Sequence, residues 1–264
     1  MKNNPYRPVA ARILKITRET AIEFTLRVEA QADITPGQFF QVSLPRTGEA
    51  PISVSSFTRD WIEFTIRAVG KLTNVLHQLK EGDTIFIRGP YGTGFPLEKY
   101  KDRNLIIVAG GSGLAPVRPL IQKALDGSIG VKSLRLIAGF KNSEGILFSH
   151  QFEDWADKCD FTLTIDKPEP GWTGNTGMVT EHIRKLSDID FADTEVVVVG
   201  PGVMMKFSTA EFVLLGVAEE KIWVSFERLM SCGIGKCGHC KIDYTYVCLD
   251  GPVLNYTHAS TLID

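Results

Sequence analysis

The sequence predicts an antiparallel β-barrel, an α/β domain with a parallel sheet, and a small C-terminal lobe that contains most of the cysteines. Three observations support this. Short segments rich in Val, Ile and Thr follow one another closely before residue 100. After residue 101, apolar runs alternate with helical segments, which is typical of a parallel sheet covered on both faces. Four of the five cysteines then lie between residues 232 and 248, where no regular period is visible.

We therefore expect three parts, at residues 1–100, 101–225 and 226–264. A net charge of -2 and a pI near 6.2 predict no basic face, which excludes nucleic acid as an expected partner. No apolar run reaches the roughly 18 residues of a transmembrane helix. The first eight residues lack the apolar region of a secretory signal, so we expect a cytoplasmic protein.

The expected elements follow the hydrophobic patterns. In the first part, we expect strands at 9–17, 22–29, 39–44, 61–69 and 84–88, and one helix at 72–79. The last of these strands is expected to end in a Gly-Pro turn. In the second part, we expect strands at 105–109, 134–139, 161–165 and 196–200, and helices at 117–126, 150–158, 179–186 and 203–215.

The cysteine cluster carries the most specific chemistry in the sequence. Its spacing is C-x4-C-x2-C-x7-C, and the candidate ligands are Cys232, Cys237, Cys240 and Cys248. Plant-type ferredoxins hold a [2Fe–2S] cluster with C-x4-C-x2-C and a more distant fourth cysteine. Glycines at 233, 235 and 238 let the backbone pass close to the cluster and direct N–H groups at its sulfurs. The spacing therefore predicts a [2Fe–2S] site.

A structural zinc ion bound by the same four cysteines is the alternative, although zinc more often takes two short C-x2-C pairs. His239 lies inside the loop and is expected to be a bystander or a hydrogen-bond donor, because four cysteines already complete the site. Cys159 stands apart, and we expect it to be a semi-buried structural residue.

Two small-residue turns are candidates for dinucleotide binding. Residues 110–116 follow an apolar strand and precede a helix, so that N–H donors and a helix N-terminus can meet a diphosphate. Such a turn alone is also common as a plain connection. A second turn, at 200–205, follows a later strand at the edge where open α/β sheets bind ligands. The candidate residues are Gly110, Gly111, Ser112, Gly113, Ala115, Pro116, Gly200, Pro201 and Met204.

Two further segments lie in the barrel half, at 51–55, which is expected to follow a strand, and at 70–73. Each segment alone would pass for an ordinary turn or helix start. Taken in order with the later turns, they resemble the ferredoxin–NADP reductase superfamily over essentially the whole chain. The resemblance implies an N-terminal flavin-binding barrel and a nicotinamide-binding α/β domain.

The resemblance also implies roles for particular residues. Ser53 matches the serine that lies near the reactive flavin nitrogen, and we expect it to tune the flavin during catalysis. The segment 70–73 matches the turn that holds the flavin diphosphate, and FAD rather than FMN is implied. The implied flavin-binding residues are Pro51, Ile52, Ser53, Val54, Ile66, Arg67, Val69, Gly70, Lys71, Leu72 and Thr73.

The sequence departs from the superfamily at Ala50, where an arginine usually pairs with the flavin diphosphate. We expect Arg67 to supply that charge instead. The cofactor preference is open: Asp166 would accept a ribose hydroxyl of NADH, and Lys167 would hold the 2′-phosphate of NADPH. We favour NADH, although both side chains also fit an ordinary solvated turn.

The cysteine loop is similar to a branch that contains dihydroorotate dehydrogenase electron-transfer subunits, sulfhydrogenase gamma subunits and anaerobic sulfite reductase B subunits. The segments 48–53, 115–118, 235–240 and 246–253, with the short x7 gap, most resemble the B subunits of anaerobic sulfite reductases. This implies that electrons pass from NAD(P)H through FAD and the cluster to iron–sulfur and siroheme-type catalytic subunits. Alternatives are the same module serving a hydrogenase or a dihydroorotate dehydrogenase, and a non-catalytic assembly protein with a zinc-bound tail.

Overall fold

The computed structural model describes residue 4 and residues 6–262, and the chain divides into two compact units. The first unit contains the chain up to Gly94 together with Glu227–Pro252, and the second contains Phe95–Phe226 with the chain from Val253 onward. The expected tail at 226–264 is thus shared between the units. Thr93 donates a backbone hydrogen bond to Gly251 in the first unit, whereas the strand Val253–Asn255 joins the sheet of the second.

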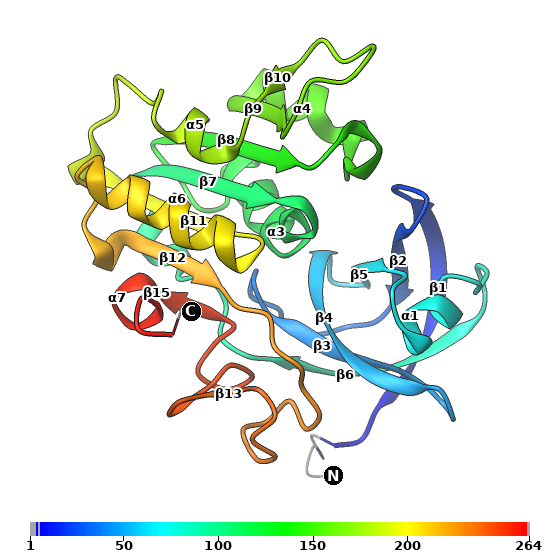
Figure 1. Cartoon of the computed structure of the whole chain (residues 1–264). Coiled ribbons are helices and arrows are strands. Elements are labelled where there is room, and N and C mark those ends of the chain that lie inside the picture. The colour runs from blue at the N-terminus through cyan, green and yellow to red at the C-terminus, as the bar shows by residue number, and fades with distance from the viewer. Residues whose placement is uncertain (1–3, 5, 263–264) are drawn as a thin grey trace. The chain divides into compact units, whose positions relative to one another are not determined.

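The first unit is built around the antiparallel barrel that the sequence predicts. Its strands close in the order β1-β2-β5-β4-β3-β6. Alternate residues point inward, so that Phe24, Leu26 and Phe64 are completely buried in the barrel core. The elements are β1 (Val9–Arg18), β2 (Glu23–Glu29), β3 (Phe39–Leu44), β4 (Gly48–Phe57), β5 (Trp61–Arg67), α1 (Lys71–Leu76) and β6 (Thr84–Tyr91) (Figure 1).

Two barrel strands are longer than expected. The segment 51–55 lies inside β4 rather than after a strand, because β3 pairs with β4 without interruption from Leu44–Gly48 to Phe39–Ser53. The strand β6 continues past Arg88 through Gly89 and Pro90, where a Gly-Pro turn was expected. A register shift in the pairing of β3 with β6 accommodates the proline at this point.

The remainder of the first unit, Glu227–Pro252, contains little regular structure. Its only assigned strands among the described residues are β13 (Lys241–Ile242) and β14 (Thr245–Tyr246), which form a small hairpin. The loop that carries the cysteines is therefore held by individual hydrogen bonds and side-chain contacts rather than by a sheet.

The second unit contains a seven-stranded sheet in the order β10-β9-β8-β7-β11-β12-β15, which is parallel except for β15 (Figure 1). Its strands are β7 (Asn104–Gly110), β8 (Ser133–Phe140), β9 (Asp160–Ile165), β10 (Asn175–Thr176), β11 (Thr194–Val199), β12 (Ile222–Ser225) and β15 (Val253–Asn255). Its helices are α2 (Leu97–Tyr100), α3 (Leu114–Leu125), α4 (Phe152–Lys158), α5 (Val179–Ile183), α6 (Gly202–Leu214) and α7 (Tyr256–Ala259). The α/β architecture predicted from the sequence is confirmed.

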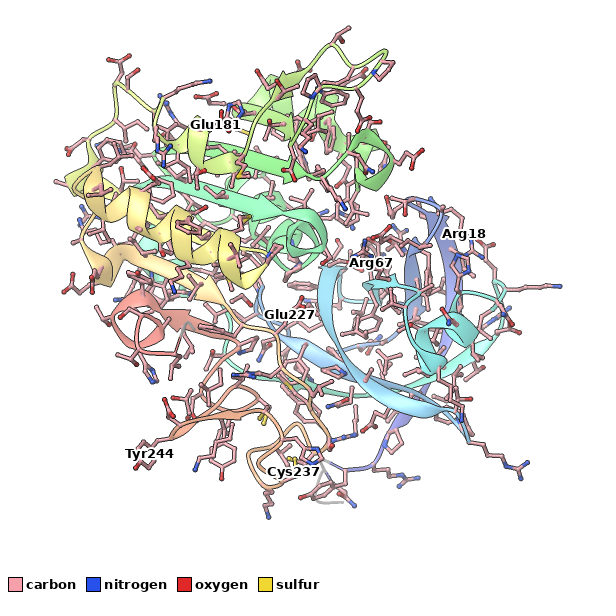
Figure 2. All side chains as sticks on the ribbon, in the orientation of Figure 1. Arg18, Arg67, Glu181, Glu227, Cys237 and Tyr244 are labelled. Atoms are coloured by element: carbon pink, nitrogen blue, oxygen red, sulfur yellow. The ribbon has the colours of Figure 1, made fainter. Side chains whose placement is uncertain are left out.

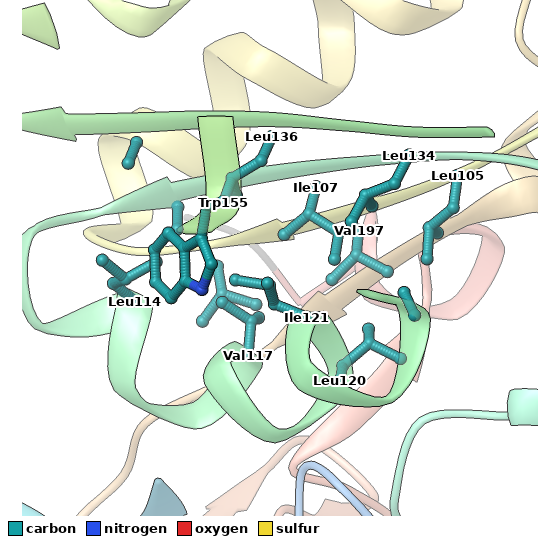
Figure 3. Close-up of a cluster of buried hydrophobic side chains, with 14 of the residues drawn as sticks. Leu105, Ile107, Leu114, Val117, Leu120, Ile121, Leu134, Leu136, Trp155 and Val197 are labelled. Atoms are coloured by element: carbon teal, nitrogen blue, oxygen red, sulfur yellow. The ribbon is translucent and has the colours of Figure 1, made fainter. Parts of the chain in front are cut away.

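The core of the second unit lies between the sheet and the helices α3 and α4. Leu114, Val117, Leu120 and Ile121 of α3 pack on the sheet beside Trp155 of α4 (Figure 3). Truncating a buried leucine in such a core costs about 2–5 kcal/mol. The strand ends on this sheet therefore have a rigid support. Among the described residues, none of the helices combines the length and the apolar character needed to cross a membrane.

Candidate functional site

The two predicted dinucleotide turns are neighbours in the structure. β7 and β11 pair in parallel, and they end at Gly110 and Val199 on the same edge of the sheet. The strand order changes direction between them, and open α/β sheets bind ligands at such a point. Residues 110–116 form a short 3-10 turn and the first turn of α3, and residues 200–204 lead into α6.

Close packing explains the glycines in these turns. A Cβ atom on Gly113 would lie 2.5 Å from the carbonyl oxygen of Val199, and backbone cannot move aside easily. A Cβ on Gly110 would lie 2.3 Å from the sulfur of Met204, which fills the space between the two turns. Met205 is the buried member of the methionine pair. The turns therefore form one surface of backbone N–H groups and small residues, which suits a diphosphate.

Asp166 and Lys167 directly follow β9 at the same edge of the sheet, two strands away from β7. Both side chains are exposed, and the backbone N–H of Asp166 donates to Phe140 at 2.9 Å. Their place at the carboxyl ends of the strands is compatible with contact to a ribose or a phosphate, and equally with a solvated turn.

In the first unit, the predicted flavin residues divide into two groups. Ser53 is half-buried in β4, and its hydroxyl makes no hydrogen bond to any other described residue, so it can meet a ligand. The side chains of Val54, Ile66 and Leu72 instead point into the barrel core. Only the backbone of these three residues can therefore contact a flavin.

The predicted diphosphate turn begins α1. The hydroxyl of Thr73 accepts hydrogen bonds from the backbone N–H groups of Val69 and Gly70 at 3.0 and 2.9 Å. This bonding fixes the turn itself. Arg67 lies at the end of β5 and forms an ion pair with Glu23 at 2.9 Å, while its side chain is 55% exposed (Figure 2). Because only its Nε–H faces Glu23 in this pair, the guanidinium retains further donors toward solvent.

The four clustered cysteines share one loop. The Cys237 thiol lies close enough to Cys232, and the Cys240 thiol close enough to Cys248, to affect its pKa. Cys240 and Cys248 are buried, whereas Cys237 is exposed on the loop (Figure 2). The glycines that separate them adopt the expected left-handed conformation, with φ of +74° at Gly233.

Backbone N–H groups point at these sulfurs. The Cys232 sulfur accepts from the N–H groups of Ile234, Lys236 and Cys237 at 3.3–3.4 Å, and the Cys248 sulfur accepts from Gly235 at 3.1 Å. Burial raises the pKa of Cys232, but the three amide hydrogen bonds outweigh it and lower the pKa to about 6. Burial and the Cys240 thiol together raise the pKa of Cys248 to about 12. The amides thus favour a thiolate at Cys232.

His239 and Cys159 make contacts outside the set of four clustered cysteines. Nδ1 of His239 lies 2.6 Å from the hydroxyl of Ser231. Cys159 is half-buried against the core of the second unit, and burial raises its pKa to about 11. Among the described residues, no three His, Cys, Asp or Glu side chains are grouped around a single metal position.

One residue that supports the loop was not predicted. Arg88 of β6 is 7% exposed and donates to the backbone carbonyls of Ser231 and Cys232 at 2.7 and 2.5 Å. It also forms a bidentate ion pair with Glu49 of β4. No local motif marks this arginine, because its partners are 39 and more than 140 positions away in the chain.

Three domain families match the chain. The oxidoreductase FAD-binding domain matches residues 11–95, and the oxidoreductase NAD-binding domain matches residues 107–210. The iron–sulfur cluster binding domain of dihydroorotate dehydrogenase B matches residues 227–259. These ranges follow the barrel, the α/β sheet and the cysteine loop.

Individual proteins are similar over nearly the whole length. Sulfhydrogenase 2 subunit gamma of Pyrococcus furiosus is 36% identical, over 97% of this chain and 97% of its own. A probable dihydroorotate dehydrogenase B (NAD(+)) electron transfer subunit of Methanocaldococcus jannaschii is 34% identical, over 94% and 89% respectively. A chain from the structure of an NADH-dependent reduced ferredoxin-NADP oxidoreductase has a TM-score of 0.79 and 27% identity, covering 100% of this chain and 94% of that one.

Fold and domain matches together define an FAD- and NAD-binding oxidoreductase of the ferredoxin–NADP reductase type. This confirms the superfamily and the enzyme class predicted from the sequence. More narrowly, the chain belongs to the family of iron–sulfur electron-transfer subunits that includes the sulfhydrogenase gamma subunits and the dihydroorotate dehydrogenase B electron transfer subunits.

Proposed function

We propose that this chain oxidises NADH, carries the electrons through FAD, and delivers them singly to a [2Fe–2S] cluster and then to a partner subunit. The observation that supports this most directly is the set of four cysteines in one loop, with backbone N–H groups directed at the sulfurs of Cys232 and Cys248. N–H donors stabilise the more negative, reduced state of an iron–sulfur cluster.

The spacing of the cysteines and the amides around them favour two irons over one zinc ion. Structural zinc sites usually take two short C-x2-C pairs, whereas plant-type [2Fe–2S] sites use C-x4-C-x2-C and a more distant fourth cysteine. The spacing here is the second kind, and the N–H groups directed at the sulfurs of Cys232 and Cys248 suit a cluster that gains negative charge on reduction.

The other roles follow from the turns and strands. The turns at 110–116 and 200–204 bind the diphosphate of the nicotinamide, and Asp166 accepts the ribose hydroxyl of NADH. On the barrel, the turn at 70–73 and the free donors of Arg67 hold the FAD diphosphate, and Ser53 hydrogen-bonds to the flavin nitrogen. Bound FAD accepts two electrons as a hydride and releases them one at a time.

The partner is proposed to be a catalytic subunit. A siroheme-type sulfite reductase is supported by the segments 235–240 and 246–253 and by the short gap before Cys248. A hydrogenase is supported by the 36% identity to a sulfhydrogenase gamma subunit over nearly the whole chain. These partners are distinguished by affinity purification of the tagged chain from its native cells, followed by assays for sulfite reduction, hydrogen evolution and dihydroorotate oxidation.

The electron path itself is tested by anaerobic purification, with iron, acid-labile sulfide, zinc and flavin measured per chain. We expect two irons, two sulfides and one FAD, and visible bands that bleach on titration with NADH. Zinc without iron, or protein without flavin, would contradict the proposal. A preference for NADPH in the same titration would contradict only the role given to Asp166.

A further inference from the structure

Gln41, in the middle of β3, has an unsatisfied side chain. It is completely buried, and neither its amide nitrogen nor its amide oxygen has a hydrogen-bond partner in the described part of the chain. Buried polar groups in folded proteins are almost always paired, because an unpaired one loses its hydration without compensation. A partner that is not a protein atom is therefore expected at this position.

The position of Gln41 connects two predicted cofactor sites within the first unit. On one side it pairs with Pro51 of β4, and the preceding residue on the same face, Phe39, pairs with Ser53. On the other side it pairs with Arg88 of β6. A Cβ atom on Gly233, the residue after Cys232, would lie 3.5 Å from Cγ of Gln41, so the cysteine loop covers this side chain.

The neighbouring arginine cannot satisfy the amide. Arg88 directs its Nε–H and one Nη2–H to Glu49, and its second Nη2–H to the carbonyl of Ser231. Its Nη1 group donates to Cys232 O at 2.5 Å and to the hydroxyl of Tyr91 at 3.3 Å. These five bonds use every N–H of the guanidinium. Arg88 therefore fixes the start of the loop above Gln41 but leaves the amide of Gln41 unpaired.

We propose that the side-chain N–H of Gln41 donates a hydrogen bond to a sulfur of the iron–sulfur cluster held by the loop. By donating this bond, Gln41 raises the cluster's reduction potential, because a donor to a cluster sulfur stabilises the added electron. The cluster is preferred to the flavin as the acceptor because the loop residue after Cys232 packs directly on Gln41, whereas Ser53 pairs with the residue two positions away. This inference rests on the proposed [2Fe–2S] cluster.

The test compares Gln41→Met, which keeps the length of the side chain and removes the amide, with Ser43→Ala on the same face of β3. Iron and flavin are counted first, and the cluster potential is then measured by redox titration monitored by electron paramagnetic resonance. We expect Gln41→Met to shift the cluster to a lower potential by about 59 mV, which corresponds to a tenfold change for one electron. Ser43→Ala should match the wild type.

An unchanged cluster potential in Gln41→Met, or a shift confined to the flavin, would overturn the inference. If Gln41→Met loses its cluster, its potential cannot be compared. The hydrogen bond is then tested by electron paramagnetic resonance on wild-type protein labelled with 15N in its glutamine side chains. A hyperfine coupling between 15N and the reduced cluster supports the bond, and its absence overturns it. Wild-type protein that lacks iron would instead contradict the proposed function, so the two failures are distinguishable.

Discussion

The glycine turns of the second unit and the cysteine loop of the first unit are built in different ways. The turns follow β7 and β11, two strands that are buried on both faces and pair over six residues. The loop has only the two-residue strands β13 and β14, and it is held by Arg88 and by N–H bonds to cysteine sulfurs. A surface supported by a sheet is formed before its ligand binds, whereas such a loop depends on its ligand.

The largest expected effect concerns removal of a cluster ligand. Cys240→Ser should lower the iron content by at least roughly tenfold, because even residues that only support a ligand affect metal affinity that strongly. Amide hydrogen exchange should accelerate at residues 231–250 and remain unchanged in β7 and β11. Cys159→Ser is the matched control, since that half-buried cysteine packs in the second unit. Equal loss of protection from exchange in residues 231–250 and in β7 and β11 would contradict the view that only the cysteine loop depends on its ligand.

The complementary change affects the preformed turns. Gly113→Ala places a methyl group 2.5 Å from the carbonyl oxygen of Val199, so the strand end and the turn must separate. Overpacking of this kind costs about 1–3 kcal/mol, which we expect as a roughly tenfold to hundredfold loss of NADH affinity in calorimetry. Iron and flavin should remain at wild-type levels in this variant.

A smaller effect is expected at the barrel, where Arg67→Ala removes the proposed contact with the FAD diphosphate. A charge-assisted hydrogen bond contributes about 1.5–3 kcal/mol, so FAD should dissociate roughly tenfold to a hundredfold more readily. Arg27→Ala is a close control, because both arginines form ion pairs between β2 and β5. If the two variants release FAD equally, the effect belongs to barrel stability and Arg67 has no special role.

The smallest expected effect is that of Ser53→Ala. Loss of one neutral hydrogen bond of about 0.5–1.5 kcal/mol should slow flavin reduction by NADH roughly two- to tenfold. Stopped-flow absorbance at saturating NADH measures this rate, and flavin content should not change, since the hydroxyl makes no bond to another described residue. A rate equal to that of the wild type would remove Ser53 from the mechanism.

Predictions from the sequence succeeded where the signal was local. The strand at 39–44 was predicted with its observed bounds, and most other strands were predicted within one or two residues. The expected positions failed where pairing with a partner strand extended an element. Pairing with β3 keeps 51–55 inside β4 and carries β6 through Pro90, and hydrophobic pattern alone does not report such pairing.

The division of the C-terminal tail also required the structure. Residues 227–252 and the strand β15 are adjacent in the chain and belong to different units, because a hydrogen bond from the Thr93 N–H to Gly251 holds one segment and pairing with β12 holds the other. These contacts join positions more than 25 residues apart, so no short window of the sequence contains both partners.

The sequence by itself determined the two fold classes, the superfamily, the order of the cofactor motifs and the cysteine spacing, because each depends on residue types at short separations. Only the tertiary structure decided that the turns at 110 and 200 meet at one strand edge, that Arg88 supports the cysteine loop, and that Gln41 lies unpaired beneath it. Each of these brings together segments that are distant in the chain. The two turns meet because β7 pairs with β11, and the loop meets β3 and β6 through side-chain contacts.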